Sequence, residues 1–457
     1  MNKKIDMGNG NINRLLWEFS LPAIIGMSVN ALYNLISRIF VGQGVNSLAI
    51  AAVTVALPIM TIAFAVSMLI GIGAMALISI RLGAQKQEEA NKIAGNAALL
   101  LIVLPFLLTC IYFLFSDPLL RLFGATSPEV LPYARDYINI IMLGNVPAAL
   151  GYGLNNFIRA EGNPQFAMFT QIIGAVVSVI LNYVFIFPLD MGIKGSALGT
   201  VLGQLVSAIW VLSYFIFGKS HIKITLKSMR PYVYIALKIL AIGFAPFSMQ
   251  IASSVQQTIL NQVVLAYGGN LALSAVGIIM SVAMILIMPI IGISQGAQPI
   301  IGYNYGAKQY ERVKETLKKA MMAGTALAIV SFAVIMLFAS PIAALFSKGD
   351  TALTEMTAHA LIIFFALLPI VGVHIIGSNY FQAVGKPVQS TILSSARQVL
   401  IFIPSLLVLP NFWGLDGVWW SAPISDALAV LLTTALLFFE MKNMSQKTDC
   451  RLSKPGN

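Results

Sequence analysis

A single acidic residue within a long apolar stretch has the clearest potential for chemistry in this chain. Asp426 lies about eleven residues into the last apolar run, which at 1.5 Å per residue puts it near the middle of a helix that could cross a membrane. An ionisable group at that depth is costly, so it is a candidate for function. Burial favours the neutral carboxyl and a nearby cation favours the carboxylate, so small changes in exposure could make Asp426 bind and release a proton.

Two arginines in apolar runs bear on what that carboxylate does. Arg397, in the preceding run, is a candidate partner of Asp426, either as part of a cation-exchange site or as one half of a permanent structural pair. Arg38 lies near the outer end of the first run, where its side chain can reach the interface. Two guanidinium groups against one deep acid would also suit an anionic substrate, such as a lipid-linked phosphate or an organic acid.

Two stripes of polar residues follow the same helical spacing. Asn30, Asn34, Ser37 and Arg38 lie at spacings of four, three and one, which puts them along one side of a helix. A second stripe further along consists of Gln250, Ser254, Gln257 and Asn261. We expect both stripes to line a substrate pathway, although polar side chains also hold membrane helices together.

Methionine and histidine provide weaker signals about substrate. Met280, Met284 and Met288 recur every fourth residue, which would make a flexible, polarizable ridge able to accept varied apolar ligands. Methionines that face lipid or pack in a core would look the same. His374 is of a type that titrates near neutrality, but it could equally be a hydrogen-bonded packing residue.

The elements that position these residues are given by an internal repeat. Arg81-Leu82-Gly83-Ala84 corresponds to Asn304-Tyr305-Gly306-Ala307, 223 positions later. The same offset carries Asn34 onto Gln257 and Arg38 onto Asn261, so the two polar stripes occupy equivalent helices. Self-similarity over such a long period indicates that the architectural unit is half of the protein.

The composition identifies these halves as sets of membrane spans. With 58% hydrophobic and 10% charged residues and a mean hydropathy of +0.85, the apolar runs exceed what a soluble core needs. We predict an all-α polytopic protein of twelve transmembrane helices in two pseudo-symmetric six-helix bundles. The spans lie near residues 15–42, 48–79, 92–115, 131–157, 165–188, 192–217, 236–266, 271–302, 316–339, 353–381, 388–410 and 414–441.

The basic residues predict the orientation of these spans. We expect an N-terminal lobe (1–217), a cytoplasmic linker (218–235), a C-terminal lobe (236–441) and a cytoplasmic polar tail (442–457). With both termini inside, only Arg121, Arg135, Lys194 and Lys348 of the 28 Lys and Arg residues fall outside. The net charge of +11 is thus a topology signal that points to anionic membrane lipids and not to nucleic acid.

The repeat architecture predicts transport. Six spans per half make the repeats parallel, an arrangement that places a substrate path between the halves and allows alternating access. The sequence has no phosphate-binding loop, metal-spaced histidine cluster or nucleophile elbow, so we expect neither an enzyme nor a bound cofactor. A scaffold or receptor without transport is the alternative from another class.

Several motifs, in order, resemble the multidrug and toxic compound extrusion family, most of all its DinF-like and MepA-like bacterial branch. They are Leu21-Pro22, the run from Tyr33 to Gly42, Arg159 to Pro164, Gln382 to Pro387, Arg397-Gln398 and Pro423 to Asp426. The resemblance implies two six-helix lobes, a central cavity and export of amphiphilic, often cationic compounds, driven by inward flow of H+ or Na+. It also implies a bacterial cytoplasmic membrane location, and we expect a monomer.

The chain departs from that family at one important position. Many members carry an aspartate where this chain has Ser37, and that carboxylate is a principal candidate for cation coupling. The fifth span also lacks the acid that this branch often has after Leu181-Asn182. The ion site has therefore moved, is built from hydroxyl and amide oxygens around Ser37, or depends on Asp426 and Arg397.

Overall fold

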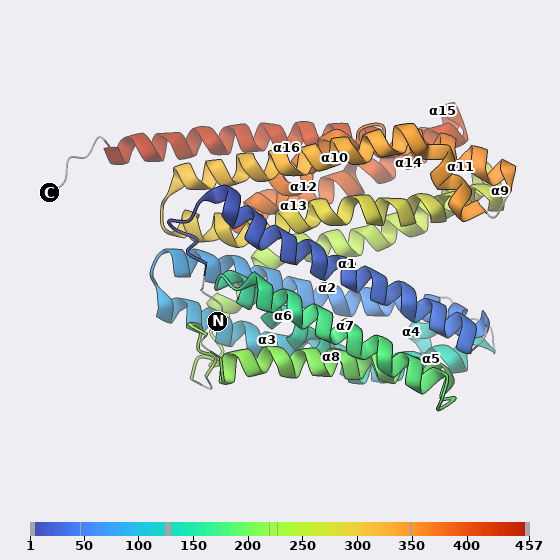
Figure 1. The fold of residues 1–457 in the computed structure, drawn as a ribbon, viewed down its shortest axis with the longest axis horizontal. Coiled ribbons are helices and arrows are strands. Elements are labelled where there is room, and N and C mark those ends of the chain that lie inside the picture. Colours follow the sequence, from blue (N-terminus) through green and yellow to red (C-terminus); the bar gives the residue numbers. More distant parts are fainter. Residues whose placement is uncertain are drawn as a thin grey trace. The chain divides into compact units, whose positions relative to one another are not determined.

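The computed structural model describes residues 5–45, 47–123, 129–218, 220–225, 227–347 and 350–452, which are helical almost throughout and contain no strand (Figure 1). The first half contains α1 (Ile12–Gly44), α2 (Ser47–Gly83), α3 (Gln87–Leu114), α4 (Ser116–Leu122), α5 (Val130–Leu143), α6 (Asn145–Ala160), α7 (Pro164–Ile186) and α8 (Gly192–Ile216). The second contains α9 (Val233–Gly306), α10 (Tyr310–Ser347), α11 (Thr351–Phe364), α12 (Leu368–Ala383), α13 (Pro387–Ser395), the π-helix η1 (Ala396–Phe402), α14 (Ile403–Val408), α15 (Pro410–Trp413) and α16 (Leu415–Leu452). The all-α prediction is confirmed.

The helices account for the twelve predicted spans. Nine helices in the described part of the chain are long and apolar enough to cross a membrane, and two bent helix pairs raise this number to eleven. The 74 residues of α9 would extend ~110 Å, far more than the roughly 30 Å of a hydrocarbon core. Gly269, with a φ of 62°, breaks α9 into two helices, which supplies the twelfth span.

Three of these spans differ in detail from the sequence prediction. The span predicted at 131–157 consists of α5 and α6, bent by 50°, and the span predicted at 353–381 consists of α11 and α12, bent by 53°. The last helix, α16, continues to Leu452, so the predicted polar tail begins as helix. Residues 453–457 of that tail lie outside the described part.

The backbone repeats together with the sequence. Of the eight positive-φ residues in the described part of the chain, six form three matching pairs: Gln85 (φ 58°) with Lys308 (60°), Gly162 (88°) with Gly385 (73°), and Gly192 with Gly414 (both 57°). The first two pairs are 223 positions apart and the third is 222 apart, so the second repeat is one residue shorter before its last helix. Because a positive φ is costly for residues other than glycine, its recurrence at equivalent places, including Gln85 and Lys308, shows that the two halves share one backbone plan.

By its internal contacts the chain divides into two compact units. Unit 1 comprises Met1–Gly10 and Leu21–Phe247, and unit 2 comprises Asn11–Ser20 and Ser248–Asn457. The contacts thus assign the linker and the first turns of α9 to unit 1. The lobe boundaries drawn from the sequence stay a prediction, and residues 219 and 226 of the linker lie outside the described part.

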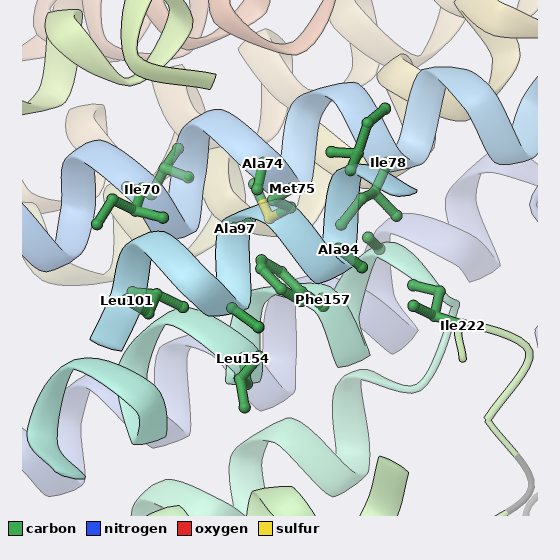
Figure 2. Packing of buried hydrophobic residues seen from close by; sticks show 14 of the residues in the cluster. Ile70, Ala74, Met75, Ile78, Ala94, Ala97, Leu101, Leu154, Phe157 and Ile222 are labelled. Carbon is green, nitrogen blue, oxygen red and sulfur yellow. The ribbon is translucent and has the colours of Figure 1, made fainter. Parts of the chain in front are cut away.

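Each unit has its own apolar core. In unit 1, side chains of α2, α3 and α6 interlock around Ile70, Leu101 and Phe157, and Ile222 of the linker closes one end (Figure 2). In unit 2, Leu260, Phe402 and Trp419 are among the buried side chains that join α9, η1 and α16. These cores fix the helices that carry the polar residues considered below.

The linker is held to unit 1 by buried polar contacts. Glu161, 6% exposed, accepts hydrogen bonds from Tyr214 Oη (2.9 Å), Ser220 Oγ (2.7 Å) and the backbone N–H of Ile222. One face of α3 holds the linker backbone as well: Gln87 Nε2 donates to His221 O (2.8 Å), Asn91 Oδ1 accepts from Lys223 N (3.0 Å) and Asn96 Oδ1 accepts from Tyr232 N (2.8 Å). This segment is therefore a fixed part of unit 1.

Candidate functional site

An ion pair lies at the centre of the candidate site in unit 2. Arg397 Nε donates to Asp426 Oδ1 at 2.6 Å, which joins η1 to α16. Asp426 is 6% exposed and Arg397 is half-buried, so the charges interact in surroundings that screen them weakly. A charge-assisted bond of this length is among the stronger contacts that two side chains make.

The helix that carries Arg397 is locally widened. Residues Ala396–Phe402 form a π-helix, a conformation that is rare and frequent at functional sites. Two contacts hold this turn in place: Ser425 Oγ donates to the carbonyl oxygen of Arg397 (2.8 Å), and Gln398 Nε2 donates to Ser253 Oγ on α9 (2.8 Å). The ion pair is therefore positioned from three elements, η1, α16 and α9.

His374, on α12, contacts the face of α16 that carries Asp426. Its Nδ1 lies 2.9 Å from Thr433 Oγ1, and that hydroxyl donates its proton to the carbonyl oxygen of Ala429 (2.7 Å). Because Thr433 has one proton, its oxygen must accept from His374, so Nδ1 carries the proton in this arrangement. Asp426 and Thr433 are seven residues apart, which puts them on one side of the helix.

The other candidates of unit 2 lie along α9. Gln257 Nε2 donates to Asn261 Oδ1 (2.9 Å), so these two members of the predicted stripe contact each other. Gln250 and Ser254 are partly buried. Met280 packs against the core of unit 2, whereas Met284 is 42% exposed and Met288 is partly buried. The methionines thus do not form one uniform surface, and their contact with substrate stays a prediction.

In unit 1, Ser37, where the sequence departs from the family it resembles, contacts Asn182, the residue after which the second departure falls. Ser37 Oγ accepts a hydrogen bond from Asn182 Nδ2 at 3.0 Å. Asn182 is fully buried, and its Oδ1 has no hydrogen-bond partner among the described residues. One turn earlier on α1, Tyr33 Oη donates to Thr200 Oγ1 of α8 (3.3 Å). The result is a cluster of neutral oxygen atoms shared by α1, α7 and α8.

The remaining residues of the first stripe do not all share one environment. Asn30 Nδ2 lies 3.3 Å from the side-chain amide of Gln171 on α7, and Asn34 Nδ2 donates to the carbonyl oxygen of Asn30 (2.8 Å). Asn34 and Arg38 are exposed. Ser37 and Asn30 therefore contact α7, whereas Asn34 bonds within α1.

Sequence reasoning missed a buried arginine in unit 1. Arg159, 6% exposed, is counted from the sequence as one of the cytoplasmic charges, yet its Nη2 lies 2.6 Å from Gln171 when the amide of Gln171 is oriented to satisfy both of its ends. Thr433 and Gln398 were also missed as contact residues. For these residues the sequence offers only one signal, a polar side chain within or next to a span. Their contacts could not be predicted because the partners are distant in sequence.

The equivalent places in the two repeats differ sharply. Gly174 of α7 corresponds to Arg397, and Gly203 of α8 corresponds to Ser425. A Cβ atom on Gly203 would lie 2.8 Å from the carbonyl oxygen of Gly174, the same distance at which Ser425 Oγ meets the carbonyl oxygen of Arg397. Asp426 then corresponds to Gln204, so the charged pair exists in one repeat only.

The described residues hold no group of three or more His, Cys, Asp or Glu side chains that could ligate a metal ion. What they do offer is one buried carboxylate paired with a cation in unit 2 and neutral oxygen atoms in unit 1. These features, on helices that cross the membrane in two similar sets, define a polytopic membrane protein of the two-repeat transporter class.

Comparison with known proteins identifies the family. The MatE family model matches residues 22–184 and again residues 245–407, two stretches of equal length at the 223-residue spacing of the repeat. The chain belongs to the MatE family, and the resemblance noted from its motifs is confirmed.

Curated relatives cover nearly the whole chain. It is 28% identical over 430 residues to multidrug export protein MepA of Staphylococcus aureus (strain NCTC 8325 / PS 47), covering 93% of both proteins. It is 27% identical over 428 residues to MepA of Staphylococcus haemolyticus (strain JCSC1435), covering 94% of both. The chain is thus a MepA-like bacterial member of its family.

Solved structures share its fold over almost its full length. An outward-facing multidrug resistance MATE family transporter of the MOP superfamily has a TM-score of 0.92 and 25% identity, with 98% of this chain and 99% of that chain covered. A MOP superfamily transporter from Pyrococcus furiosus, whose reported binding-pocket polarity is reversed, has a TM-score of 0.91 and 25% identity, covering 97% and 100%.

Proposed function

We propose that this protein is a multidrug efflux antiporter that exports amphiphilic, cationic small molecules by alternating access, driven by inward flow of H+ or Na+. The efflux assignment depends on one observation, the full-length similarity to proteins named multidrug export protein MepA. Its two matched repeats support alternating access, since parallel repeats of this kind rock about a site near the membrane midplane.

Coupling is assigned to the pair formed by Arg397 and Asp426. Protonation of Asp426, or binding of a cation to its carboxylate, removes or shares the attraction that holds Arg397 at 2.6 Å. The guanidinium would then lose its anchor on α16, and η1 could change its packing. Such a step links occupancy by an ion to the position of a helix, which antiport requires.

Ethidium efflux from a pump-deficient bacterium tests this assignment. Asp426→Asn, expressed at the wild-type level in the membrane, should lose gradient-driven export. The matched control is Asp416→Asn, which neutralises an exposed carboxylate near the start of the same helix, where it contacts His359. Normal export by Asp426→Asn would exclude Asp426 as the coupling group, whereas loss of export by both variants would point to a general effect of charge.

The coupling ion is found by collapsing one gradient at a time. Purified protein in dye-loaded vesicles should export with either a proton gradient or a sodium gradient as its only driving force. Proton drive is expected if Asp426 is the coupling group, and sodium drive is expected if the oxygen cluster around Ser37 and Asn182 binds the ion. Absence of flux under every ion condition would refute transport and leave the scaffold or receptor alternative.

An anionic or lipid-linked substrate is the second candidate function. The exposed guanidinium of Arg38 on α1 supports an anionic substrate. The hypothesis also needs the guanidinium of Arg397, but that group is paired with Asp426. This pairing favours cationic substrates. Competition experiments would decide the matter, because an anionic amphiphile should inhibit ethidium efflux only if it binds the same pathway.

We also propose a cytoplasmic-membrane location with both termini in the cytoplasm, and a monomeric protein. The distribution of Lys and Arg along the chain supports the orientation. Alkaline phosphatase fused after Leu452 should be inactive in cells, while fusion in the segment between α11 and α10 should be active. Light scattering of the detergent-solubilised protein measures its oligomeric state.

A further inference from the structure

A cavity of about 210 Å³ opens in unit 1 where α2 ends and where α3 and α9 begin. The charged residues that line it are Arg81, Glu89, Lys92 and Lys238. None of them belongs to the candidate coupling or substrate residues. The cavity is therefore a separate feature of the protein and requires its own explanation.

The cavity is positively charged on balance. Arg81 Nη1 pairs with Glu89 Oε2 at 3.1 Å, and Lys86, outside the cavity, also reaches Glu89 at 2.8 Å. Lys92 also interacts electrostatically with this carboxylate. The lining nevertheless holds three cations, Arg81, Lys92 and Lys238, against one carboxylate, so the cavity suits an anion.

The rest of the lining is largely apolar and lies at one end of the membrane-spanning helices α2 and α3. Leu77, Ile93 and Ile235 form this apolar wall, and the first two are buried. The ring of Tyr234 lies 4.1 Å from Lys238 Nζ and is 69% exposed. Exposed aromatic rings beside lysine at the end of a membrane span are typical of the interfacial belt.

We propose that this cavity binds the phosphodiester headgroup of an anionic phospholipid. Lys92 and Lys238 would contact the phosphate, and an acyl chain would follow Leu77 and Ile235 into the hydrocarbon region. A soluble anion would use the lysines but would leave the apolar wall without a partner. Basic pockets between membrane helices on the cytoplasmic side bind lipid headgroups in this way, and the positions of Arg81 and Lys86 put this end of unit 1 on that side.

The site is specific to the first repeat. In the second repeat the positions of Arg81, Glu89 and Lys92 are occupied by Asn304, Arg312 and Glu315. There, Arg312 Nε donates to Asn304 Oδ1 at 3.0 Å, and Lys319 pairs with Glu315 at 2.6 Å. The equivalent positions of the second repeat therefore do not reproduce this basic lining. The cavity is a property of the first repeat and not of the common backbone plan.

Native mass spectrometry of the full-length protein in detergent tests the proposal directly. The probes are phosphatidylglycerol, phosphatidylcholine and inorganic phosphate, each added alone. We expect the wild-type protein to retain phosphatidylglycerol in preference to phosphatidylcholine. The double variant Lys92→Gln/Lys238→Gln should bind phosphatidylglycerol about tenfold or more weakly, because each lysine near a lipid surface contributes to attraction of anionic headgroups.

A matched control removes two other exposed lysines expected on the same side, as Lys318→Gln/Lys442→Gln, and should leave phosphatidylglycerol binding unchanged. Tyr234→Ala should weaken binding by a smaller factor, since it removes only the ring beside Lys238. Equal retention of the two lipids, or an unchanged Lys92→Gln/Lys238→Gln protein, would overturn the proposal. So would inorganic phosphate that binds as tightly as phosphatidylglycerol, because the apolar wall would then contribute nothing.

Discussion

The two repeats use the same backbone contact for different purposes. Where α7 meets α8 in the first repeat, Gly174 and Gly203 let the helices approach closely and no charge is present. In the second repeat the equivalent contact joins η1 to α16, with Arg397 and Ser425 at these positions and Asp426 beside them. The backbone plan is common to both halves, but an ionisable pair is present in only one. Chemistry in such a protein is therefore sought where the halves disagree.

The largest effect is expected from breaking the ion pair on one side. Asp426→Leu leaves Arg397 half-buried without its partner and should lower the free energy of unfolding by about 3 kcal/mol. Replacing both residues, as Arg397→Leu/Asp426→Leu, should recover most of this stability, because no unpaired charge remains. Thermal unfolding in detergent measures both effects. If the pair only supports structure, the double variant should also recover ethidium efflux; if Asp426 couples the ion, it should not.

The second-largest effect is expected at the close contact between Gly174 and Gly203 in the first repeat. Gly203→Ala adds a Cβ atom 1.9 Å from Ser178 Oγ and 2.8 Å from the carbonyl oxygen of Gly174, so α7 and α8 must separate. Overpacking of this kind costs about 2 kcal/mol. Gly277→Ala is the matched control in a membrane helix, since no atom lies within 4 Å of its added Cβ. Equal melting temperatures for the two variants would contradict close packing at Gly203.

A smaller and equal effect is expected where the repeats agree. Gly192 and Gly414 both have a φ of 57°, and a Cβ atom would meet nothing within 4 Å at Gly414 and only Val45, at 3.8 Å, at Gly192. The cost of alanine at either position is then the strain of a positive-φ backbone, about 1.5 kcal/mol. Thermal unfolding of Gly192→Ala and Gly414→Ala should show similar losses. Clearly different losses would mean that the turns are not equivalent.

The smallest effect comes from single hydroxyl groups. Ser425→Ala removes the hydrogen bond to the Arg397 carbonyl in unit 2, and Ser37→Ala removes the one from Asn182 in unit 1. Each should cost about 1 kcal/mol. Efflux separates the two variants: Ser37→Ala should abolish sodium-driven export if the oxygen cluster binds the ion, and Ser425→Ala should leave it intact.

The spans and the repeat could be predicted from sequence because both are properties of apolar patterning over long windows. The bends between α5 and α6 and between α11 and α12 could not be found in that way, since a bend leaves hydropathy unchanged. A local signal existed, because Pro147 and Pro369 lie just beyond the two breaks and proline interrupts helical hydrogen bonding. The break at Gly269 fell within a predicted loop and agrees with the structure.

The candidate site could be predicted only in part from the sequence. Asp426 and Arg397 stand out because charges are rare in apolar runs, and their contact confirms that they are partners. The π-helix at Ala396–Phe402 left no trace in the sequence, since it depends on how one turn packs against α9 and α16. The bond between Ser37 and Asn182 joins residues 145 positions apart, and only the folded chain brings them together.

Glu161 carries a consequence for anyone who would divide this protein into two pieces. Its carboxylate is satisfied by Ser220 and Ile222, both downstream of the first set of six spans, and the corresponding residue of the second set is the apolar Val384. A fragment that stops at residue 217 would retain only Tyr214 as a donor and would bury an anion with too few partners. A fragment that runs through Tyr232 keeps all three donors to Glu161.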